Sequence, residues 1–219
     1  MDVINQHTGE KWYYSDIVKD HFFHPRNLLL EKPQNEDEYD AHGMVGSSAC
    51  GDMMEMWMKI EVGSEKLEAE KERIKDLKWK TFGCASAIAA TSMFSTMLTE
   101  NGGMTLTNAL KVRPQDVIMR LDGLPNRKIH CSVLADKAFQ KTANDYFRKT
   151  GQYDRIIVDG AKIIDTKLNI TDKDIEEAVL EGAQTLEDVQ KKLKVGIGSP
   201  EIIAEIEQLT RFYKEKYYG

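Results

Sequence analysis

The chain contains three cysteines, and each stands alone beside a candidate ligand or a glycine. Cys50 lies two residues before Asp52, Cys84 follows a glycine, and Cys131 directly follows His130. Together these residues offer three thiolates, one carboxylate and one imidazole, which are the ligand types that iron and zinc select in proteins. The sequence therefore indicates a site for metal or thiol chemistry that is assembled from three separate segments.

The expected local structure favours ionised thiols at two of these cysteines. Cys84 ends an expected strand just before a helix, and Cys131 is expected to precede another helix. The unpaired N–H groups and the dipole at a helix N-terminus lower the pKa of a nearby thiol. Gly51 allows an unusual backbone turn that would direct the residues on either side of it at one point. His130 can offer a neutral nitrogen to a metal.

Four interpretations of this set are open from the residues alone. The cysteines could be small buried hydrophobic residues, although all three lie at element boundaries beside Gly, Asp or His. A structural zinc site usually pairs its cysteines about two to four residues apart, and no such pair occurs here. A thiol hydrolase would need the adjacent Cys131 and His130 to hold the geometry of nucleophile and base, which adjacent residues rarely do. A labile iron–sulfur or sulfur-transfer site fits ligands on loops, with Asp52 as the weaker, exchangeable one.

Composition limits the functional classes. The chain has 219 residues and a formal net charge of -6, and this acidic balance argues against general nucleic-acid binding and against an anionic membrane surface. No apolar run approaches the roughly 18 residues that cross a bilayer, and residues 1–12 lack the apolar core of a signal peptide. Three cysteines are too few for a disulfide framework. We therefore expect a cytoplasmic protein that binds neither nucleic acid nor membrane.

An antiparallel sheet is expected in the first part of the chain. Residues 53–62 alternate between apolar and polar side chains, which is the period of a half-buried strand. A second strand is expected over residues 74–82, and a third in the segment before Cys50. The charged run from Glu65 to Glu72 is expected to be a solvated surface. His42 is expected in a loop near the site.

Helices are expected around this sheet. Ser15 can cap a short helix that runs to about Phe23, which makes His21 a polar surface residue near the helix end. Residues 85–98, rich in Ala and Ser, are expected to form a buried helix. A short helix is expected from Pro114 to about residue 123, and a long one after Cys131. Strands followed by helices indicate an α+β fold, here a short antiparallel sheet of about three strands packed with helices.

The sequence changes character near residue 150, so we expect one domain over residues 1–150 and a small all-α module over residues 151–219. Asp159-Gly160 between apolar residues indicates a hairpin over residues 156–164. Three short helices are indicated by their caps, namely Thr171 with Asp174, Thr185 with Asp188, and Ser199-Pro200.

Four motifs, in one order along the chain, resemble the NifU/IscU family of iron–sulfur cluster assembly scaffolds. They are His24-Pro25-Arg26-Asn27, the segment from Gly43 to Asp52 that contains Cys50, Gly83-Cys84-Ala85-Ser86, and Lys128-Ile129-His130-Cys131-Ser132. The likeness covers about residues 13–149. Like members of the IscU-type branch of the family, this chain has a histidine, His130, directly before the third cysteine.

The resemblance implies a scaffold or carrier and not a turnover enzyme. Such scaffolds accept persulfide sulfur from a pyridoxal-phosphate-dependent cysteine desulfurase, take Fe²⁺ and electrons from an iron donor and an electron donor, build a transient [2Fe–2S] cluster and pass it to apo-proteins. Carried onto this chain, Cys50, Asp52, Cys84 and His130 would be metal ligands, and Cys131 would be the persulfide acceptor and a further cluster ligand. Zn²⁺ commonly fills this ligand set when iron is absent, and a homodimer fits the family. A zinc-stabilised protein-interaction module is the alternative function.

The tail resembles a second module. Residues from about 164 to 209 are similar to the bacterioferritin-associated-ferredoxin-like [2Fe–2S] module that follows the scaffold domain in full NifU proteins. Asp165, Lys167, Ser199 and Ile202 stand at about the places of the four cysteines of that module. We therefore expect no cluster in this part of the chain, and a structural or partner-docking role for it.

Overall fold

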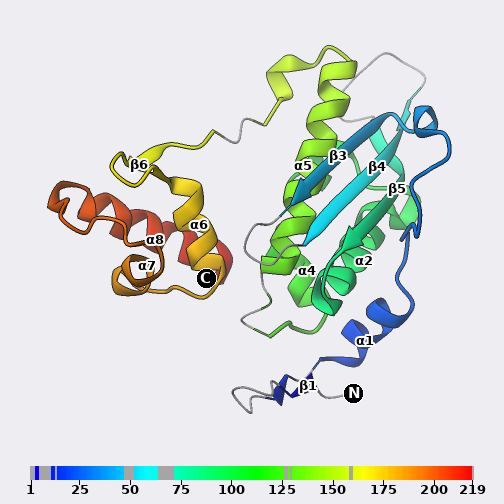
Figure 1. Ribbon diagram of the computed structural model, residues 1–219. Helices are drawn as coiled ribbons and strands as arrows, with labels where there is room; N and C mark the ends of the chain where they lie inside the picture. Colours follow the sequence, from blue (N-terminus) through cyan, green and yellow to red (C-terminus); the bar gives the residue numbers. More distant parts are fainter. Residues whose placement is uncertain are drawn as a thin grey trace. The chain divides into compact units, whose positions relative to one another are not determined.

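The structure is a computed structural model that describes residues 3–4, 11–12, 14–46, 52–63, 72–125, 128, 130–157 and 160–218. The chain divides into two compact units, Met1–Ile157 and Val158–Gly219 (Figure 1). Across the described part of the chain, no helix is both long enough and apolar enough to cross a membrane.

A three-stranded antiparallel sheet forms the centre of the first unit, which confirms the predicted fold class. Its strands are β3 (Ala41–Gly46), β4 (Met53–Val62) and β5 (Glu72–Phe82), in the order β3-β4-β5. Two shorter strands, β1 (Val3–Ile4) and β2 (Lys11–Trp12), pair with each other. The register joins Met53 to Gly46 on one side and to Phe82 on the other. The residues that directly precede β4 and directly follow β5 therefore lie at the same end of the sheet.

Two long helices pack against the sheet and against each other, α2 (Ala85–Thr99) and α5 (His130–Lys149) (Figure 1). The shorter helices of this unit are α1 (Asp16–Phe23), α3 (Leu106–Ala109) and α4 (Pro114–Arg120). Single turns of 3-10 helix are η1 (Glu36–Glu38), η2 (Glu100–Gly102) and η4 (Tyr153–Arg155). α1 begins as predicted, because the side chain of Ser15 accepts a hydrogen bond from the N–H of Val18 at 3.1 Å.

The core lies between the sheet and these helices. Its fully buried side chains include Met54, Met56, Met58, Leu77 and Trp79 from the strands, and Phe94, Leu98, Phe139 and Phe147 from the helices. Burying each large apolar side chain contributes about 2 kcal/mol. α5 crosses β3 so closely that a Cβ at Gly43 would lie 2.5 Å from the Oγ1 of Thr142. A glycine is therefore required at this crossing.

The segment after α1 covers the outer edge of β5. The backbone carbonyl of Asn27 accepts a hydrogen bond from the N–H of Trp79 at 3.2 Å, and the N–H of Leu29 donates to the carbonyl of Trp79 at 2.7 Å. The indole N–H of Trp79 donates to the carbonyl of Arg26 at 2.9 Å. Asn27 has a φ of 63°, in the left-handed region that asparagine tolerates better than most residues. The motif at residues 24–27 thus closes a sheet edge that would otherwise be open.

The middle of β4 is buried on both faces, so the predicted half-buried strand is wrong there. Glu55 and Trp57 are buried together with the methionines between them. Glu55 accepts a hydrogen bond from Lys32 Nζ at 2.7 Å and lies 2.9 Å from His42 Nε2. The His42 ring stacks on Trp57, with ring centroids 5.2 Å apart. His42 therefore belongs to β3 and not to a loop, and these partners offset the desolvation of the carboxylate.

Glu72 starts β5 and is fully buried, so the predicted solvated surface is wrong at this end of the run. Residues 64–71 lie outside the described residues. The Glu72 carboxylate accepts hydrogen bonds from Tyr146 at 3.1 Å, Gln152 at 2.6 Å and Arg155 at 2.6 Å. Burial and the neighbouring charge of Glu72 raise the pKa of Tyr146. These contacts join β5 to α5 and η4.

His21 is also buried, against the expectation of a surface residue. Its Nδ1 lies 2.8 Å from the hydroxyl of Ser92, which fixes α1 to α2. Burial, with the nearby charge of Arg26, lowers the pKa of His21. The pattern of α1 alone could not show this, because Ser92 is 71 residues further along the chain.

The second unit contains a hairpin and three helices. The hairpin pairs β6 (Ile163–Asp165) with β7 (Ile170–Thr171). The helices are α6 (Asp172–Leu180), α7 (Leu186–Leu193) and α8 (Ile203–Tyr218), the last preceded by η5 (Pro200–Ile202). Capping boxes of Thr171 with Asp174 and of Thr185 with Asp188 begin α6 and α7, as predicted.

The turn of this hairpin lies at residues 166–169. The predicted turn at Asp159-Gly160 includes Asp159, which lies outside the described residues. The Oδ1 atom of Asp165 accepts hydrogen bonds from the N–H groups of Lys167 at 2.9 Å and Leu168 at 3.2 Å. Asn169 then takes a left-handed φ of 55°. An Asp–backbone turn followed by a left-handed asparagine therefore closes the hairpin of β6 and β7.

Three of the four residues that stand at the expected cysteine places of this unit contact one another or the same loop. Asp165 Oδ2 accepts a hydrogen bond from the N–H of Gly196 at 3.1 Å. Lys167 Nζ donates to the hydroxyl of Ser199 at 2.9 Å and to the carbonyl of Gly198 at 3.1 Å. Hydrogen bonds from backbone N–H groups, the one from Gly196 foremost, lower the pKa of Asp165. Polar contacts thus tie the hairpin to the loop before η5.

Candidate functional site

Cys84 lies at the junction between β5 and α2. It is the N-cap residue of α2, and its carbonyl accepts the N–H of Ile88 at 3.0 Å. A Cβ at the preceding Gly83 would lie 3.0 Å from both Ala87 Cβ and Thr81 Oγ1, and 3.2 Å from the Oδ2 atom of Asp52. A side chain at residue 83 would therefore crowd the Asp52 carboxylate.

Asp52 directly precedes β4, at the same end of the sheet as Cys84. Its side chain is only 8% exposed, and its buried Oδ2 atom has no hydrogen-bond partner within the described residues. Leaving a buried polar group unpaired costs about 1–3 kcal/mol. An acceptor that has no partner among the described residues is suited to binding an added ligand such as a metal ion.

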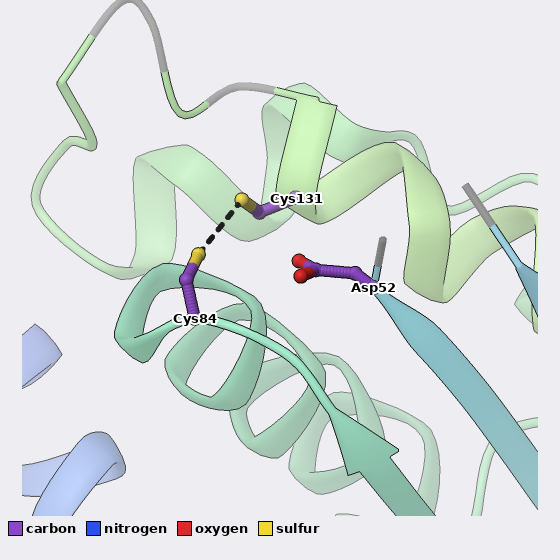
Figure 2. A group of neighbouring side chains, drawn as sticks. All are labelled: Asp52, Cys84 and Cys131. Carbon is purple, nitrogen blue, oxygen red and sulfur yellow. Dashed lines mark hydrogen bonds between the residues drawn. The ribbon is translucent and has the colours of Figure 1, made fainter. Parts of the chain in front are cut away.

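Cys131 completes the group from α5. It lies in the first turn of α5, not before the helix as predicted, because α5 begins one residue earlier at His130. Its side chain is fully buried, and its Sγ lies 3.4 Å from the Sγ of Cys84. The ligand atoms of Asp52, Cys84 and Cys131 all lie within 4.8 Å of one another. Figure 2 shows the two thiols directed at each other, with the carboxylate directed at the space beside them.

The structure thus brings together three of the five predicted site residues. Cys50 lies outside the described residues, two positions before Asp52 in the chain. His130 is placed in the first turn of α5, next to Cys131, and its side chain is not among those described.

The pKa values of the two thiols are shifted in opposite directions. The hydrogen bond from Cys131 lowers the pKa of Cys84 to about 5, against the opposing effect of its own burial. The N–H of Ala87 and the charge of Lys128 act in the same direction as this hydrogen bond. The same contact, together with burial, raises the pKa of Cys131. At neutral pH the pair therefore consists of a Cys84 thiolate and a Cys131 thiol.

Sequence reasoning missed Lys128 as a member of this site. Its positive charge lowers the pKa of both cysteines. The residue was visible in the sequence as part of the segment from Lys128 to Ser132, but nothing in the spacing of that segment shows that it acts on Cys84, 44 positions earlier.

Alkylation of Cys84 is expected to be fast even in mildly acidic solution. A thiol reacts as its thiolate, which is present above its pKa, so a pKa of about 5 should bring the iodoacetamide rate of Cys84 near its plateau by about pH 6. Mass spectrometry of the metal-free Cys50→Ser chain would measure this, since only the two paired thiols remain. The Cys131→Ala change removes the hydrogen bond and should move the profile to higher pH. A rate that still rises through about pH 8.5, as for an ordinary thiol, would contradict the assignment.

The features of this site define a class of protein. A small α+β domain presents a thiolate, a thiol and a buried carboxylate from three segments that meet at one end of the sheet. Two sulfur donors and one oxygen donor suit iron or zinc, and the thiolate also suits exchange with sulfur compounds. The site is thus that of a metal- or sulfur-binding domain.

Comparison with known proteins identifies the family. Residues 13–153 match the model of the NifU-like N terminal domain, so the chain belongs to the NifU/IscU family of iron–sulfur cluster assembly scaffolds. The resemblance seen in the four sequence motifs is thereby confirmed.

Individual relatives show how far the similarity extends. The iron-sulfur cluster assembly scaffold protein IscU 1 of Archaeoglobus fulgidus is 41% identical over 143 residues, which are 65% of this chain and 82% of that protein. The IscU scaffold protein of Azotobacter vinelandii is 39% identical over 138 residues, 63% of this chain and 97% of that protein. The nitrogen fixation protein NifU of Nostoc is 33% identical over 206 residues, 93% of this chain and 65% of that protein. Only the alignment with NifU, among these three, is long enough to include much of the second unit.

Proposed function

We propose that the protein assembles a transient [2Fe–2S] cluster and passes it to apo-proteins. The observation that carries the proposal is the convergence of two thiols and a buried carboxylate within 4.8 Å at one end of the sheet. The Oδ2 atom of this carboxylate has no hydrogen-bond partner among the described residues. Thiolates are the usual ligands of cluster iron. The Asp52 oxygen is a harder and weaker partner for this iron, which favours release over permanent storage.

The proposed ligands are Cys50, Asp52, Cys84, His130 and Cys131. The side chains of Cys50 and His130 are not described. These two residues are included because Cys50 is two positions from Asp52 and His130 directly precedes Cys131 in the chain. Cys131 is proposed to accept persulfide sulfur from a pyridoxal-phosphate-dependent cysteine desulfurase. Fe²⁺ and electrons would come from an iron donor and an electron donor. The protein would be a carrier in this scheme and not a turnover enzyme.

The second unit is proposed to hold no cluster. It contains neither cysteine nor histidine, since the last residue of either type is Cys131. Asp165 and Lys167 instead bind partners within the unit, at distances of 2.9–3.2 Å. Its role would be structural or in docking a partner.

Anaerobic reconstitution tests the proposed function. We expect the purified chain, mixed with ferrous iron, cysteine and a cysteine desulfurase, to develop the visible absorption and Mössbauer signals of a [2Fe–2S] cluster. Cys84→Ser should lose most of this signal. Asp16→Ala, which removes an aspartate whose side chain is 99% exposed, should keep it.

Zinc separates the alternative function from this one. The same donor set suits Zn²⁺ in tetrahedral geometry, so a zinc-stabilised interaction module would also bind and be stabilised by Zn²⁺. A chain that binds Zn²⁺ tightly through Cys84 and Cys131 but never develops cluster signals, even in strictly anaerobic solution, would favour the interaction module and sink the scaffold function.

A further inference from the structure

The Cys84 and Cys131 side chains are in direct contact. Their Sγ atoms are 3.4 Å apart. A disulfide bond is about 2.05 Å long, so small rotations of two side chains would bring these sulfurs to bonding distance. The two residues therefore form a dithiol pair.

Such a pair addresses a need of the proposed function. The outer sulfur of a persulfide has the oxidation level of elemental sulfur, whereas a cluster contains sulfide. Each sulfur atom must therefore gain two electrons before it enters a cluster. Two neighbouring thiols can supply them, because their oxidation to a disulfide releases two electrons.

We propose that Cys84 attacks the inner sulfur of a persulfide on Cys131, which expels sulfide and leaves a Cys84–Cys131 disulfide. The step rests on the proposed function, because it starts from a persulfide at Cys131. A bond forms between the two Sγ atoms, and the bond between Cys131 Sγ and the outer sulfur breaks. The bonding electron pair leaves with the outer sulfur, which keeps the proton of the persulfide and departs as the hydrosulfide ion. One persulfide and one thiolate thus become one disulfide and one hydrosulfide ion.

The geometry selects the inner sulfur as the point of attack. Cys131 Sγ is the atom that Cys84 Sγ already contacts. Attack on the outer sulfur would only move the persulfide to Cys84, without any net reduction. Cys131 Sγ is also fully buried, whereas Cys84 is half-buried. A thiol from solution therefore reaches the inner sulfur less readily than Cys84 does.

The expected result is one sulfide per persulfide without any added reductant. The Cys50→Ser chain retains only the two cysteines of the pair, which makes the product disulfide unambiguous. It is treated anaerobically, without iron, with a cysteine desulfurase that carries a persulfide and has been freed of excess cysteine, and sulfide is trapped with monobromobimane. Mass spectrometry of the unreduced digest should show the Cys84–Cys131 cross-linked peptide in the same amount as the sulfide released. A dithiol such as dithiothreitol should then restore both thiols.

Variants of Cys84 provide the decisive comparison. In Cys50→Ser chains that also carry Cys84→Ser or Cys84→Ala, the persulfide should remain on Cys131 and release at least about tenfold less sulfide until dithiothreitol is added. Circular dichroism checks that these variants fold. Sulfide release at an undiminished rate from them, or a persulfide that persists on Cys131 beside a free Cys84, would overturn the proposed step.

A second measurement separates failure of this step from failure of the scaffold function. Inorganic sulfide and ferrous iron, supplied together to the unaltered chain, bypass the persulfide. A cluster that forms from inorganic sulfide, while persulfide yields no disulfide, would refute the dithiol step alone. A cluster that forms from neither source would refute the scaffold function.

Discussion

Replacing Asp52 with alanine is expected to slow cluster transfer to an acceptor protein by about tenfold, which corresponds to a barrier about 1.4 kcal/mol higher. The carboxylate is the hardest and weakest of the proposed ligands, so it is the one that an incoming acceptor thiolate displaces first. Without it, the acceptor must displace a thiolate or an imidazole. The rate would be followed by visible circular dichroism after mixing the loaded protein with an apo-ferredoxin.

Two further variants make this result specific. Asp52→Cys supplies a fourth thiolate and should slow transfer at least as much, whereas the exposed Asp16→Ala should transfer at the unaltered rate. Loss of folding is not expected to interfere, because Asp52→Ala removes a buried oxygen that has no partner among the described residues. The metal-free variant should be more stable by about 1 kcal/mol. An unchanged transfer rate would exclude Asp52 as the labile ligand.

Replacing Arg155 with alanine is expected to lower the free energy of unfolding of the first unit by about 3 kcal/mol. The guanidinium lies 2.6 Å from the Glu72 carboxylate, whose side chain is only 1% exposed, and 4.4 Å from the centre of the Phe147 ring. Removing one partner of a buried ion pair leaves the other charge poorly compensated, which costs about 3–5 kcal/mol. Tyr146 and Gln152 still donate to Glu72, so we expect the lower end of this range.

Tryptophan fluorescence during urea denaturation would measure this loss. All three tryptophans, Trp12, Trp57 and Trp79, lie in the first unit, so their signal reports on that unit alone. Arg148→Ala is the matched control, because Arg148 is an exposed arginine of α5. Equal effects of the two substitutions would show that the buried ion pair does not stabilise the unit.

The regular elements were predictable because their signals are local. The alternation of residues 53–62 predicted β4 to the residue, and the caps at Ser15, Thr171 and Thr185 predicted the starts of three helices. In each case the determining contacts join residues at most four positions apart along the chain, or follow from period-two alternation.

The buried charges were not predictable for the opposite reason. Glu72 ends a run of charged residues, and only contacts with Tyr146, Gln152 and Arg155, 74 to 83 positions away, remove it from water. Glu55 is likewise buried, and its partners Lys32 and His42 lie on two other segments. Polar partners that are distant in the chain leave no periodic pattern.

The site was predictable in its residue types but not in its internal arrangement. The motifs identified Asp52, Cys84 and Cys131 as members of one site. They gave no indication that the two thiols touch, because Cys84 and Cys131 are 47 positions apart. The difference between the pKa values of the two thiols also depends on this contact, and the charge of Lys128 lowers both values.

The hydrogen bonds that hold the hairpin of the second unit to its following loop do not depend on metal. Asp165, Lys167 and Ser199 hold the hairpin to the following loop with hydrogen bonds at 2.9–3.2 Å, and these bonds require no metal and no reduced sulfur. All cysteines and histidines lie at or before residue 131. We therefore expect loss of metal or oxidation of thiols to leave the hydrogen bonds of the second unit intact.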